Sequence, residues 1–486
     1  MLKNFLKTTN RNLIKNKSYV IINILGLSFS LACCIVAYLN YKVAADFDSN
    51  HINQDRIYKI QVSKSVQEQM VPYGITPLPL GADLASQLSE VRYSTRFATG
   101  GIVLKKDNNV LDEGLAFGED DFFKVFTFPF KYGSINAFFD RGKIILSEET
   151  ANKLFGDVDP TEELITLVKS DGSVYTKIVG GVLEKIPMNS SLHFSGLMHL
   201  DEYFSLYEIE RNNWKSFIAG TFVMTEGTEF PSEVISALNK NYINIQNEAR
   251  DDWKVAEYTL ESLKTLGVNA ENVRANWLGQ APPKPAVLVP LIMAVLMLLI
   301  ACFNFTNTSI AISSKRLKEI GIRKVMGGNK QQLIAQFMGE NLILTLIALG
   351  LSIILAIYLV PAYSAMWDFI DLKLDFVSDS EIYIFLFVLL IFTSVVAGVY
   401  PSFYVSSFEP VKILKGNLTL GGTSLFSKSL LTAQYVLTAI ALISSLAFAQ
   451  NANYQADLDV GFEKSNIIFI RVNNESTYDR LAQKIA

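Results

Sequence analysis

Residues 287–312 read VLVPLIMAVLMLLIACFNFTNTSIAI, a run without a single charged side chain. A helix of about 20 apolar residues crosses the hydrocarbon core of a bilayer, which is about 30 Å thick. This run therefore predicts a membrane-spanning helix. Runs of the same kind predict further spans, and together the five lie at residues 19–41, 287–312, 342–361, 382–400 and 430–449. We expect an α-helical membrane protein.

The composition of the 486 residues agrees with this class, since 50% are hydrophobic and only 19% are charged. The formal net charge of -4 argues against nucleic-acid binding, which usually needs a basic domain. The three cysteines, Cys33, Cys34 and Cys302, all fall in apolar runs. The sequence therefore predicts neither a disulfide framework nor a metal site built on thiolates, and no cofactor.

The flanks of the spans predict the orientation, because Lys and Arg concentrate on the cytoplasmic side. Five cations lie in residues 1–17, six between the second and third spans, and three between the fourth and fifth. The loop between the third and fourth spans holds one cation, Lys373, against five acids. We expect a cytoplasmic N-terminus and place residues 42–285 outside the membrane.

The pattern of apolar residues over 42–285 predicts a large mixed α/β domain. Alternating apolar residues predict strands, for example at 57–62 and 143–147, and helical periodicity predicts a helix over 148–155. The acids of this segment are scattered, which favours a solvated surface over a cation site. The predicted organisation of the chain is span one within 1–41, the outer domain 42–285, a membrane domain 286–404, a linker 405–428, span five at 429–449, and a second outer segment 450–486.

The tail from residue 450 onward resembles the start of the first outer domain. Lys17-Ser18 and Lys428-Ser429 open the first and fifth spans, and Asn40-Tyr41 is mirrored by Asn453-Tyr454. A strand pattern then follows each pair, at 57–62 and 467–472. Matches in the same order indicate an internal repeat. We expect the tail to begin a second copy of the outer domain, in a truncated form of a duplicated protein.

Several kinds of chemistry have no support in the sequence. The interiors of the five apolar runs hold no Asp, Glu, Lys, Arg or His, which argues against proton-coupled or voltage-gated transport. His51, His193 and His199 lack zinc-protease spacing and are interpreted as residues of a polar surface. No phosphate-binding loop G-x-x-x-x-G-K-[ST] occurs, so we expect no ATP hydrolysis by this chain.

Between the second and third spans, residues 314–328 predict a short amphipathic helix along the inner face of the membrane. Leu317 and Ile320 are three residues apart, as are Ile322 and Val325, and the glycines at 327 and 328 supply a stop. Such a helix, joined to two spans, could receive force. The alternative is that its cations only anchor helix ends at anionic headgroups.

Residues 315–328, KRLKEIGIRKVMGG, closely resemble the cytoplasmic coupling helix of FtsX/MacB-type ABC transporter permeases. Residues 397–402, AGVYPS, with the later FEPVKILK, are similar to the family's exit from its last span. Leu154-Phe-Gly156 and Val179-Gly-Gly-Val-Leu183 are similar to its MacB-like extracytoplasmic core domain. After Gly156 the chain departs from the P-x-G-K-like turn common in the family, so that loop is not transferred.

The resemblance implies the permease subunit of an ABC transporter in a bacterial inner membrane. It implies two copies or a pseudo-dimer of duplicated halves, with cytoplasmic ATPase subunits as partners. Force would enter at the coupling helix and move the outer domain. The residues assigned to ATPase docking are Arg316, Glu319, Ile320, Gly321, Arg323, Lys324 and Gly327.

Two further groups in the spans have open interpretations. Gly26 and Ser30 form a small-x-x-x-small pattern that would permit close helix packing at a dimer seam. Asn304, Thr306, Asn307 and Thr308 could hydrogen-bond across helices or meet interfacial water, and interfacial water is preferred.

Three functions fit these observations. The first is export of a substrate, or its extraction at the outer membrane face. The second is a regulator without transport that moves an extracytoplasmic partner, such as a cell-wall hydrolase. The third is a receptor with an outer sensing domain, against which the short inner loops argue because they cannot hold an output domain.

Overall fold

The computed structural model describes residues 17–82, 84–315, 317–367, 370–377, 379–407, 425–459, 461 and 483–484. Arg316, most of the predicted linker and the strand expected at 467–472 lie outside these residues. The described chain divides into a helical unit, which extends to Val43 and resumes at Lys284, and an outer unit, Ala44–Pro283.

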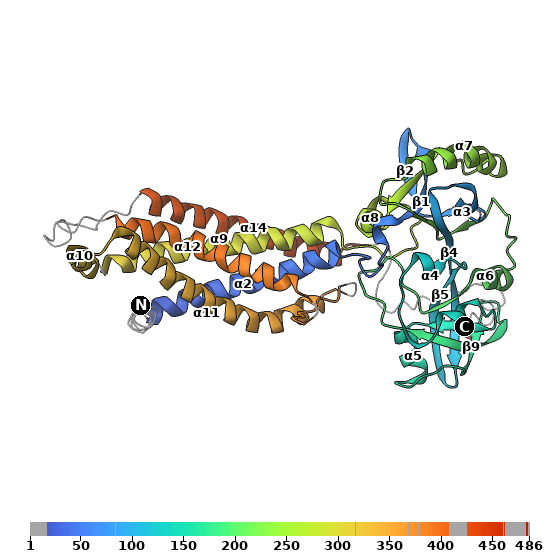
Figure 1. Ribbon diagram of the computed structural model, residues 1–486, viewed down its shortest axis with the longest axis horizontal. Helices are drawn as coiled ribbons and strands as arrows, with labels where there is room; N and C mark the ends of the chain where they lie inside the picture. The colour runs from blue at the N-terminus through green and yellow to red at the C-terminus, as the bar shows by residue number, and fades with distance from the viewer. Residues whose placement is uncertain are drawn as a thin grey trace. The chain divides into compact units, whose positions relative to one another are not determined.

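The described part of the helical unit contains five long helices that run alongside one another (Figure 1). They are α2 (Lys17–Ala45), α9 (Lys284–Lys315), α11 (Lys330–Ser364), α12 (Glu381–Ser406) and α14 (Leu425–Ala456). Each is long and apolar enough to cross a membrane, which confirms the five predicted spans. The helices extend beyond the apolar runs because backbone hydrogen bonds continue wherever the sequence tolerates a helix, whether or not its side chains are apolar.

Helix α12 is held to its neighbours by hydrogen bonds from side chains to backbone carbonyls. The amide Nδ2 of Asn341 in α11 donates to the carbonyl of Ser394 at 2.6 Å, and Thr306 Oγ1 in α9 donates to the carbonyl of Ala397 at 3.1 Å. Thr306 is 3% exposed, so the preference for interfacial water at this position was wrong. A hydroxyl in this core needs a protein acceptor, because hydrocarbon offers none.

Helix α2 packs along α9 in the same way. Ser30 Oγ donates to the carbonyl of Met297 at 3.2 Å, and Asn40 Nδ2 donates to the carbonyl of Ala286 at 3.0 Å. Near its C-terminal end, Lys42 Nζ lies 2.7 Å from Asp379 Oδ1 and 2.9 Å from Glu381 Oε2, at the start of α12. The end of α2 and the start of α12 therefore lie at the same end of the bundle.

The outer unit is built on a mixed sheet of eleven described strands, in which β5–β10 and β7–β9 are parallel pairs. In sheet order the strands are β13 (Glu257–Ser262), β1 (Ile57–Val66), β12 (Gly220–Thr225), β4 (Val91–Lys106), β5 (Asn109–Gly118), β10 (Gly196–His199), β7 (Lys143–Leu146), β9 (Val174–Leu183) and β6 (Phe130–Gly133). Two more strands join this sheet, β2 (Gln69–Tyr73) beside β1 and β8 (Leu164–Val168) beside β4 and β9. The short strands β3 (Thr76–Pro77) and β11 (Phe217–Ile218) pair with each other. The predicted α/β domain and its quoted strands are confirmed.

Short helices connect and cover these strands. They are α3 (Leu84–Gln87), α4 (Phe122–Val125), α5 (Glu148–Phe155), α6 (Leu200–Tyr207), α7 (Ser232–Ala249) and α8 (Leu263–Asn269), with the 3₁₀ turns η1 (Gln54–Arg56), η2 (Ile135–Phe139) and η3 (Ala270–Asn272). Helix α5 has the bounds that the sequence predicts. Its N-cap Ser147 accepts a hydrogen bond from the Thr150 amide, and Gly156 at φ +77° closes it, so local residues define both ends.

Two of the three histidines are buried, which corrects their interpretation as surface residues. His51 is 1% exposed; it packs against Phe126 and Phe128, its Nδ1 accepts the Thr127 amide at 3.1 Å, and burial lowers its pKa to about 4. His199, 7% exposed, caps α6, since its Nδ1 accepts the Asp201 amide at 3.1 Å. Both imidazoles stabilise local structure.

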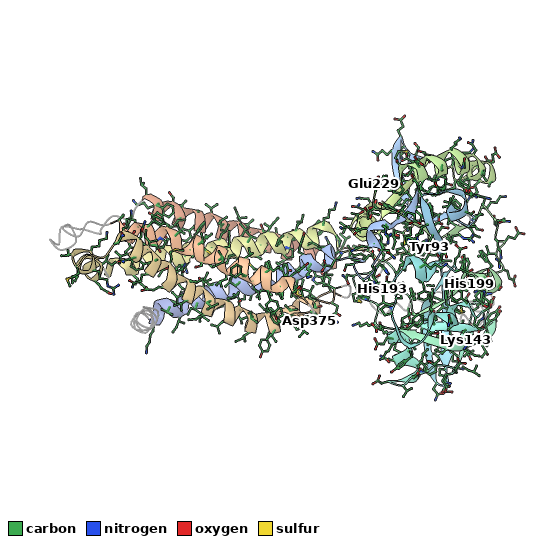
Figure 2. The ribbon with its side chains drawn as sticks, viewed as in Figure 1. Tyr93, Lys143, His193, His199, Glu229 and Asp375 are labelled. Carbon is green, nitrogen blue, oxygen red and sulfur yellow. The ribbon has the colours of Figure 1, made fainter. Side chains whose placement is uncertain are left out.

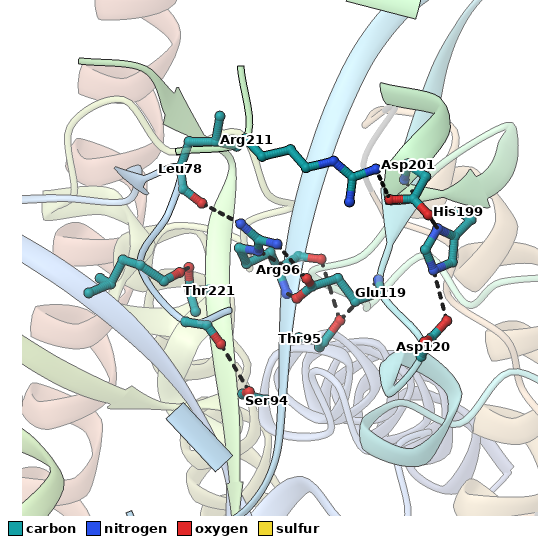
Figure 3. Close-up of polar contacts among 12 residues, drawn as sticks. Leu78, Ser94, Thr95, Arg96, Glu119, Asp120, His199, Asp201, Arg211 and Thr221 are labelled. Carbon is teal, nitrogen blue, oxygen red and sulfur yellow. Dashed lines mark hydrogen bonds and ion pairs between the residues drawn. The ribbon is translucent and has the colours of Figure 1, made fainter. Parts of the chain in front are cut away.

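A buried ion pair fixes β4 against the segments on either side of it (Figure 3). Arg96 donates from Nε and Nη2 to Glu119 Oε1, at 3.1 and 2.6 Å, and from Nη1 to the carbonyl of Leu78 at 2.8 Å. Glu119 Oε2 also accepts the backbone amide of Arg96 at 2.9 Å. Several good hydrogen bonds of this kind compensate the desolvation of both charges.

The segment that follows α2 and the segment that precedes α9 meet at one loop of the outer unit. Asp48, just after α2, is fully buried, and its carboxylate accepts hydrogen bonds from the amide and hydroxyl of Ser191, both at 2.6 Å, and from the Ser190 hydroxyl at 3.2 Å. Gly279, shortly before α9, donates its amide to the carbonyl of Ser191 at 2.8 Å. Ser191 therefore contacts both the segment that follows α2 and the segment that precedes α9.

The close approach of α11 and α12 gives a first prediction. A Cβ at Gly398 would lie 2.1 Å from Asn341 Nδ2, whereas one at Gly350 would have no atom within 4 Å. Gly398→Ala should destabilise the helical unit by about 1–3 kcal/mol through overpacking. Gly350→Ala, the matched control, should be neutral or slightly stabilising. Thermal unfolding in detergent measures both, and equal effects would contradict this packing.

Asp48 gives a prediction about pH. Burial raises its pKa to about 6 despite the three hydrogen bonds that it accepts. The pKa of Asp48 is higher in the folded chain than in the unfolded one. Its contribution to the free energy of unfolding is therefore fully present below about pH 4 and is lost as the pH rises through about 6. Asp48→Asn should remove this dependence, so that the variant gains about 3 kcal/mol relative to the native protein between pH 4 and pH 7.

The measurement is the unfolding of the full chain, followed by tryptophan fluorescence, across that pH range. Asp55→Asn is the control, since the Asp55 side chain is 60% exposed. A stability difference for Asp48→Asn that does not change with pH would rule out a buried, titrating carboxylate.

Candidate functional site at the α10 end of the bundle

The predicted coupling segment forms the short helix α10, Leu317–Val325, between α9 and α11 (Figure 1). The amide of Gly327 donates to the carbonyl of Lys324 at 3.1 Å, and that of Gly328 to the carbonyl of Arg323 at 2.9 Å. These bonds, with Gly327 at φ +93°, form a Schellman motif. A Cβ at Gly328 would lie 2.8 Å from the carbonyl oxygen of Arg323, so both glycines are required.

The next helix begins immediately, which makes the turn short and rigid. Asn329 is the N-cap of α11, and its side chain accepts the amide of Gln331 at 3.3 Å. The side chain of Gln332 in turn accepts the amide of Asn329 at 3.2 Å, which completes a capping box. The C-cap of α10 and the N-cap of α11 are adjacent, so no flexible linker separates the two helices.

One face of α10 is fixed to the bundle by polar contacts. Arg323 Nη2 donates to Glu319 Oε1 at 2.6 Å, and its Nη1 donates to Gln336 Oε1 in α11 at 2.8 Å. Gln336 continues the chain of hydrogen bonds to Glu340 at 3.1 Å. Lys324 Nζ donates to the carbonyl of Ser406, at the C-terminal end of α12, at 2.6 Å.

The same face carries the apolar contact of α10 with the bundle. Ile320 is 3% exposed and packs with Leu333 of α11 and Val405 of α12. Phe337 and Tyr404 border this cluster. Helix α10 is thereby joined to both α11 and α12.

The opposite face of α10 is exposed and apolar. Ile322 is 55% exposed, Val325 is 63% exposed, and Met326, just beyond the helix, is 83% exposed. Their spacing of three and four residues places them on one side of the helix. We call these three residues the outer face of α10.

The residues predicted to dock the ATPase do not all lie on one face of α10. Ile320 and Gly321 are buried, Gly327 is exposed in the turn, and Arg316 lies outside the described residues. Arg323 and Lys324 contact the bundle, whereas Glu319 bonds to Arg323 within α10.

The outer face was not among the residues predicted from the sequence. Its signal was present, since Leu317/Ile320 and Ile322/Val325 are two apolar pairs separated by five positions, which cannot share one side of a helix.

Gly26 and Ser30, the predicted dimer pair, also have different surroundings. Ser30 is 4% exposed and bonds to the carbonyls of Gly26 and Met297 of its own chain. Gly26 is exposed, and a Cβ placed there would have no atom within 4 Å. Gly26 therefore retains a surface for another helix, whereas Ser30 is already occupied by α9.

Among the residues with described positions, no group of three or more His, Cys, Asp or Glu side chains is arranged to hold a metal ion.

Two family models match the chain. The MacB-like periplasmic core domain matches residues 20–241, and the FtsX-like permease C-terminal domain matches residues 291–410. The second match includes α10 and both of its partner helices, α11 and α12.

Solved structures with similarity include a domain of a protein named as a permease from Porphyromonas gingivalis, with 20% identity and a TM-score of 0.35 over 49% of this chain and 98% of that one. The periplasmic region of MacB from Actinobacillus actinomycetemcomitans has 12% identity and a TM-score of 0.33 over 48% and 99%. The extracellular domain of the ABC-type transporter YknZ from Gram-positive bacteria has 14% identity and a TM-score of 0.30 over 42% and 99%.

No curated protein matches the chain. The two family models nevertheless cover most of the outer unit and of the helices α2 to α12, in the expected order along the sequence. With a MacB-like periplasmic core domain followed by an FtsX-like permease domain, the chain belongs to the FtsX/MacB-type permease family.

Proposed function

We propose that this chain is the membrane subunit of an ABC transporter, which receives work from a separate cytoplasmic ATPase at α10. Permeases of this family are components of ABC-type systems. The observation that carries the proposal is the two-sided environment of α10, which is fixed to the bundle on one face and exposes apolar side chains on the other.

The fixed face explains how force would be transmitted. A push on α10 reaches α11 through the Arg323–Gln336 hydrogen bond and α12 through the Lys324 hydrogen bond. The Schellman turn and the capping box connect α10 to α11 without a flexible linker. Glu319, Arg323 and Lys324 therefore act as positioning residues, which hold α10 where an ATPase can contact it.

The outer face explains how the ATPase would bind. Exposed large apolar residues that cluster on a soluble surface mark protein interaction sites, and a few buried anchors usually supply most of the binding energy. Ile322, Val325 and Met326 are the anchors in this proposal, and the backbone of Gly327 lies beside them. The cations of the segment then steer the approach of the partner and contact lipid headgroups.

The spans would transmit displacement and carry no ions. Their buried polar groups, such as Thr306 and Asn341, bond to neighbouring backbones. The outer unit is then the working part, for export of a substrate or its extraction at the outer membrane face. Two copies of the chain, or of duplicated halves, would serve a pair of ATPase subunits.

The orientation belongs to the same proposal. α9 begins next to the end of α2, since Asn40 bonds to Ala286, and it ends at α10. α10 and the connections to the outer unit are therefore at opposite ends of the bundle. With a cytoplasmic N-terminus, α10 faces the cytoplasm and residues 42–285 are extracytoplasmic.

The docking proposal predicts the effect of charge on the outer face. Val325→Asp combined with Met326→Asp should reduce co-purification of a P-loop ATPase from native membranes by about tenfold or more, because the anchors become charged. Thermal unfolding should not change, since both side chains are exposed. Val174→Asp, an exposed position of the outer unit at 61%, is the control and should retain the ATPase.

A second variant separates docking from positioning. Glu319→Ala combined with Arg323→Ala should lower both ATPase recovery and the temperature of unfolding, since it loosens α10 from α11. Full ATPase recovery with the Val325/Met326 variant would show that the ATPase binds elsewhere.

The orientation predicts which side of the membrane a thiol reagent can reach. Met326→Cys should react with an impermeant maleimide only in inside-out vesicles, and Val174→Cys only from the outer side. Background labelling is expected to be low, since Cys34 and Cys302 are buried and Cys33 is partly buried. Reaction of Met326→Cys from the outer side would contradict the orientation and the docking proposal together.

A further inference from the structure

The outer unit contains a hollow of about 260 Å³ that opens to the surface. Its walls come from the middle of β5, from the start of α5 and from the loop 184–195 between β9 and β10. His193, labelled in Figure 2, lies on this loop. The volume is slightly below the roughly 300–1,000 Å³ of most sites for drug-sized ligands, so it suits a smaller molecule.

The hollow is lined by charges of both signs. Two carboxylates, Glu113 and Glu149, face two ammonium groups, Lys153 and Lys185. Lys153 Nζ lies 2.8 Å from Glu149 Oε1 and 3.7 Å from Glu113 Oε1, so the charges are close together on one wall. The formal charge of these four side chains is zero, which suits a ligand with both charges better than a simple anion or cation.

Part of the lining is fixed and part is apolar. Ser195 Oγ donates to Glu113 Oε2 at 2.6 Å, which holds this carboxylate in one orientation. Ile186, Met188 and Phe194 supply an apolar side. A ligand with an ammonium, a carboxylate and an apolar side chain would complement the carboxylates, the ammonium groups and the apolar side of the lining. Amino acids and short peptides carry these three groups.

The other side of the same loop holds the connections to the membrane helices. Residues 186, 188 and 193–195 line the hollow, and between them Ser190 and Ser191 bind the Asp48 carboxylate. Ser191 also accepts the amide of Gly279. A Cβ at Gly279 would lie 2.5 Å from the Ser190 carbonyl oxygen, so the contact leaves little space. The wall of the hollow thus cannot move without disturbing these contacts.

We propose that this hollow binds a free amino acid or a short peptide through the two charged ends of that ligand. We also propose that loop 184–195 couples ligand binding to the segment that follows α2 and to the segment that precedes α9. The inference goes beyond the proposed function and does not depend on it. The ammonium of the ligand contacts Glu113 and Glu149, and the carboxylate contacts Lys185. Binding tightens the loop around Asp48 and Gly279.

The first test is calorimetric titration of the full chain in lipid nanodiscs with the dipeptide L-leucyl-L-leucine. N-acetyl-Leu-Leu lacks the ammonium, and Leu-Leu-amide lacks the carboxylate. Each analogue should bind about tenfold more weakly than the dipeptide, since each loses one charge contact. No heat of binding at millimolar dipeptide would overturn the site, and equal affinity of all three would overturn its assignment to a dipolar ligand.

Variants test the residues of the lining. Lys185→Met should weaken the dipeptide about tenfold and remove its advantage over Leu-Leu-amide, while the acetylated analogue is less affected. Lys185 is exposed, so the variant should fold. Lys254→Met, at an exposed lysine outside the hollow, is the control and should bind like the native chain. Equal binding by the Lys185 and Lys254 variants would overturn the carboxylate contact.

Hydrogen exchange tests the coupling. With saturating dipeptide, the amides of Asp48, Ser191 and Gly279 should exchange about threefold more slowly, because each donates to a contact of the loop. Binding without a change at these amides would overturn the coupling and leave the site. No ATPase is present in these experiments, so their outcome is independent of the docking proposal.

Discussion

Charged groups and polar groups without a hydrogen-bond partner are unfavourable in hydrocarbon, and this cost constrains both the sequence and the packing of the helical unit. The predicted spans carry no Asp, Glu, Lys, Arg or His in their apolar runs. Three of the polar residues in the helices, Asn341, Thr306 and Ser30, donate to carbonyls of neighbouring helices. These bonds use acceptors that every helix already has, and they fix how the helices pack. Charged contacts, such as that of Lys42, occur at the ends.

This constraint also determines where work can enter. A short helix can be bonded to several spans at once only where their ends leave the hydrocarbon, and α10 has that position. Its inner face uses charged side chains that the bilayer interior would exclude, Arg323 and Lys324 among them. Its outer face, with Met326 at the tip, is left for a partner in our proposal.

Features with a local cause could be predicted from the sequence. The five spans follow from runs of apolar residues, and α5 follows from a cap, a short helical period and a closing glycine. The stop at Gly327 is likewise local. Contacts between distant segments could not be predicted. Asp48 and Ser191 are 143 positions apart, the burial of His51 depends on Phe126 and Phe128, and the division of α10 into two faces depends on α11 and α12.

Helix α14 differs from the other spans, because none of its described side chains is buried. The apolar cluster of the bundle draws on α2, α9, α11 and α12 and on the segment before α12, without any residue of α14. Lipid tails solvate apolar side chains as well as a protein interior does. Removal of this helix would therefore leave the buried apolar cluster of the other four helices intact.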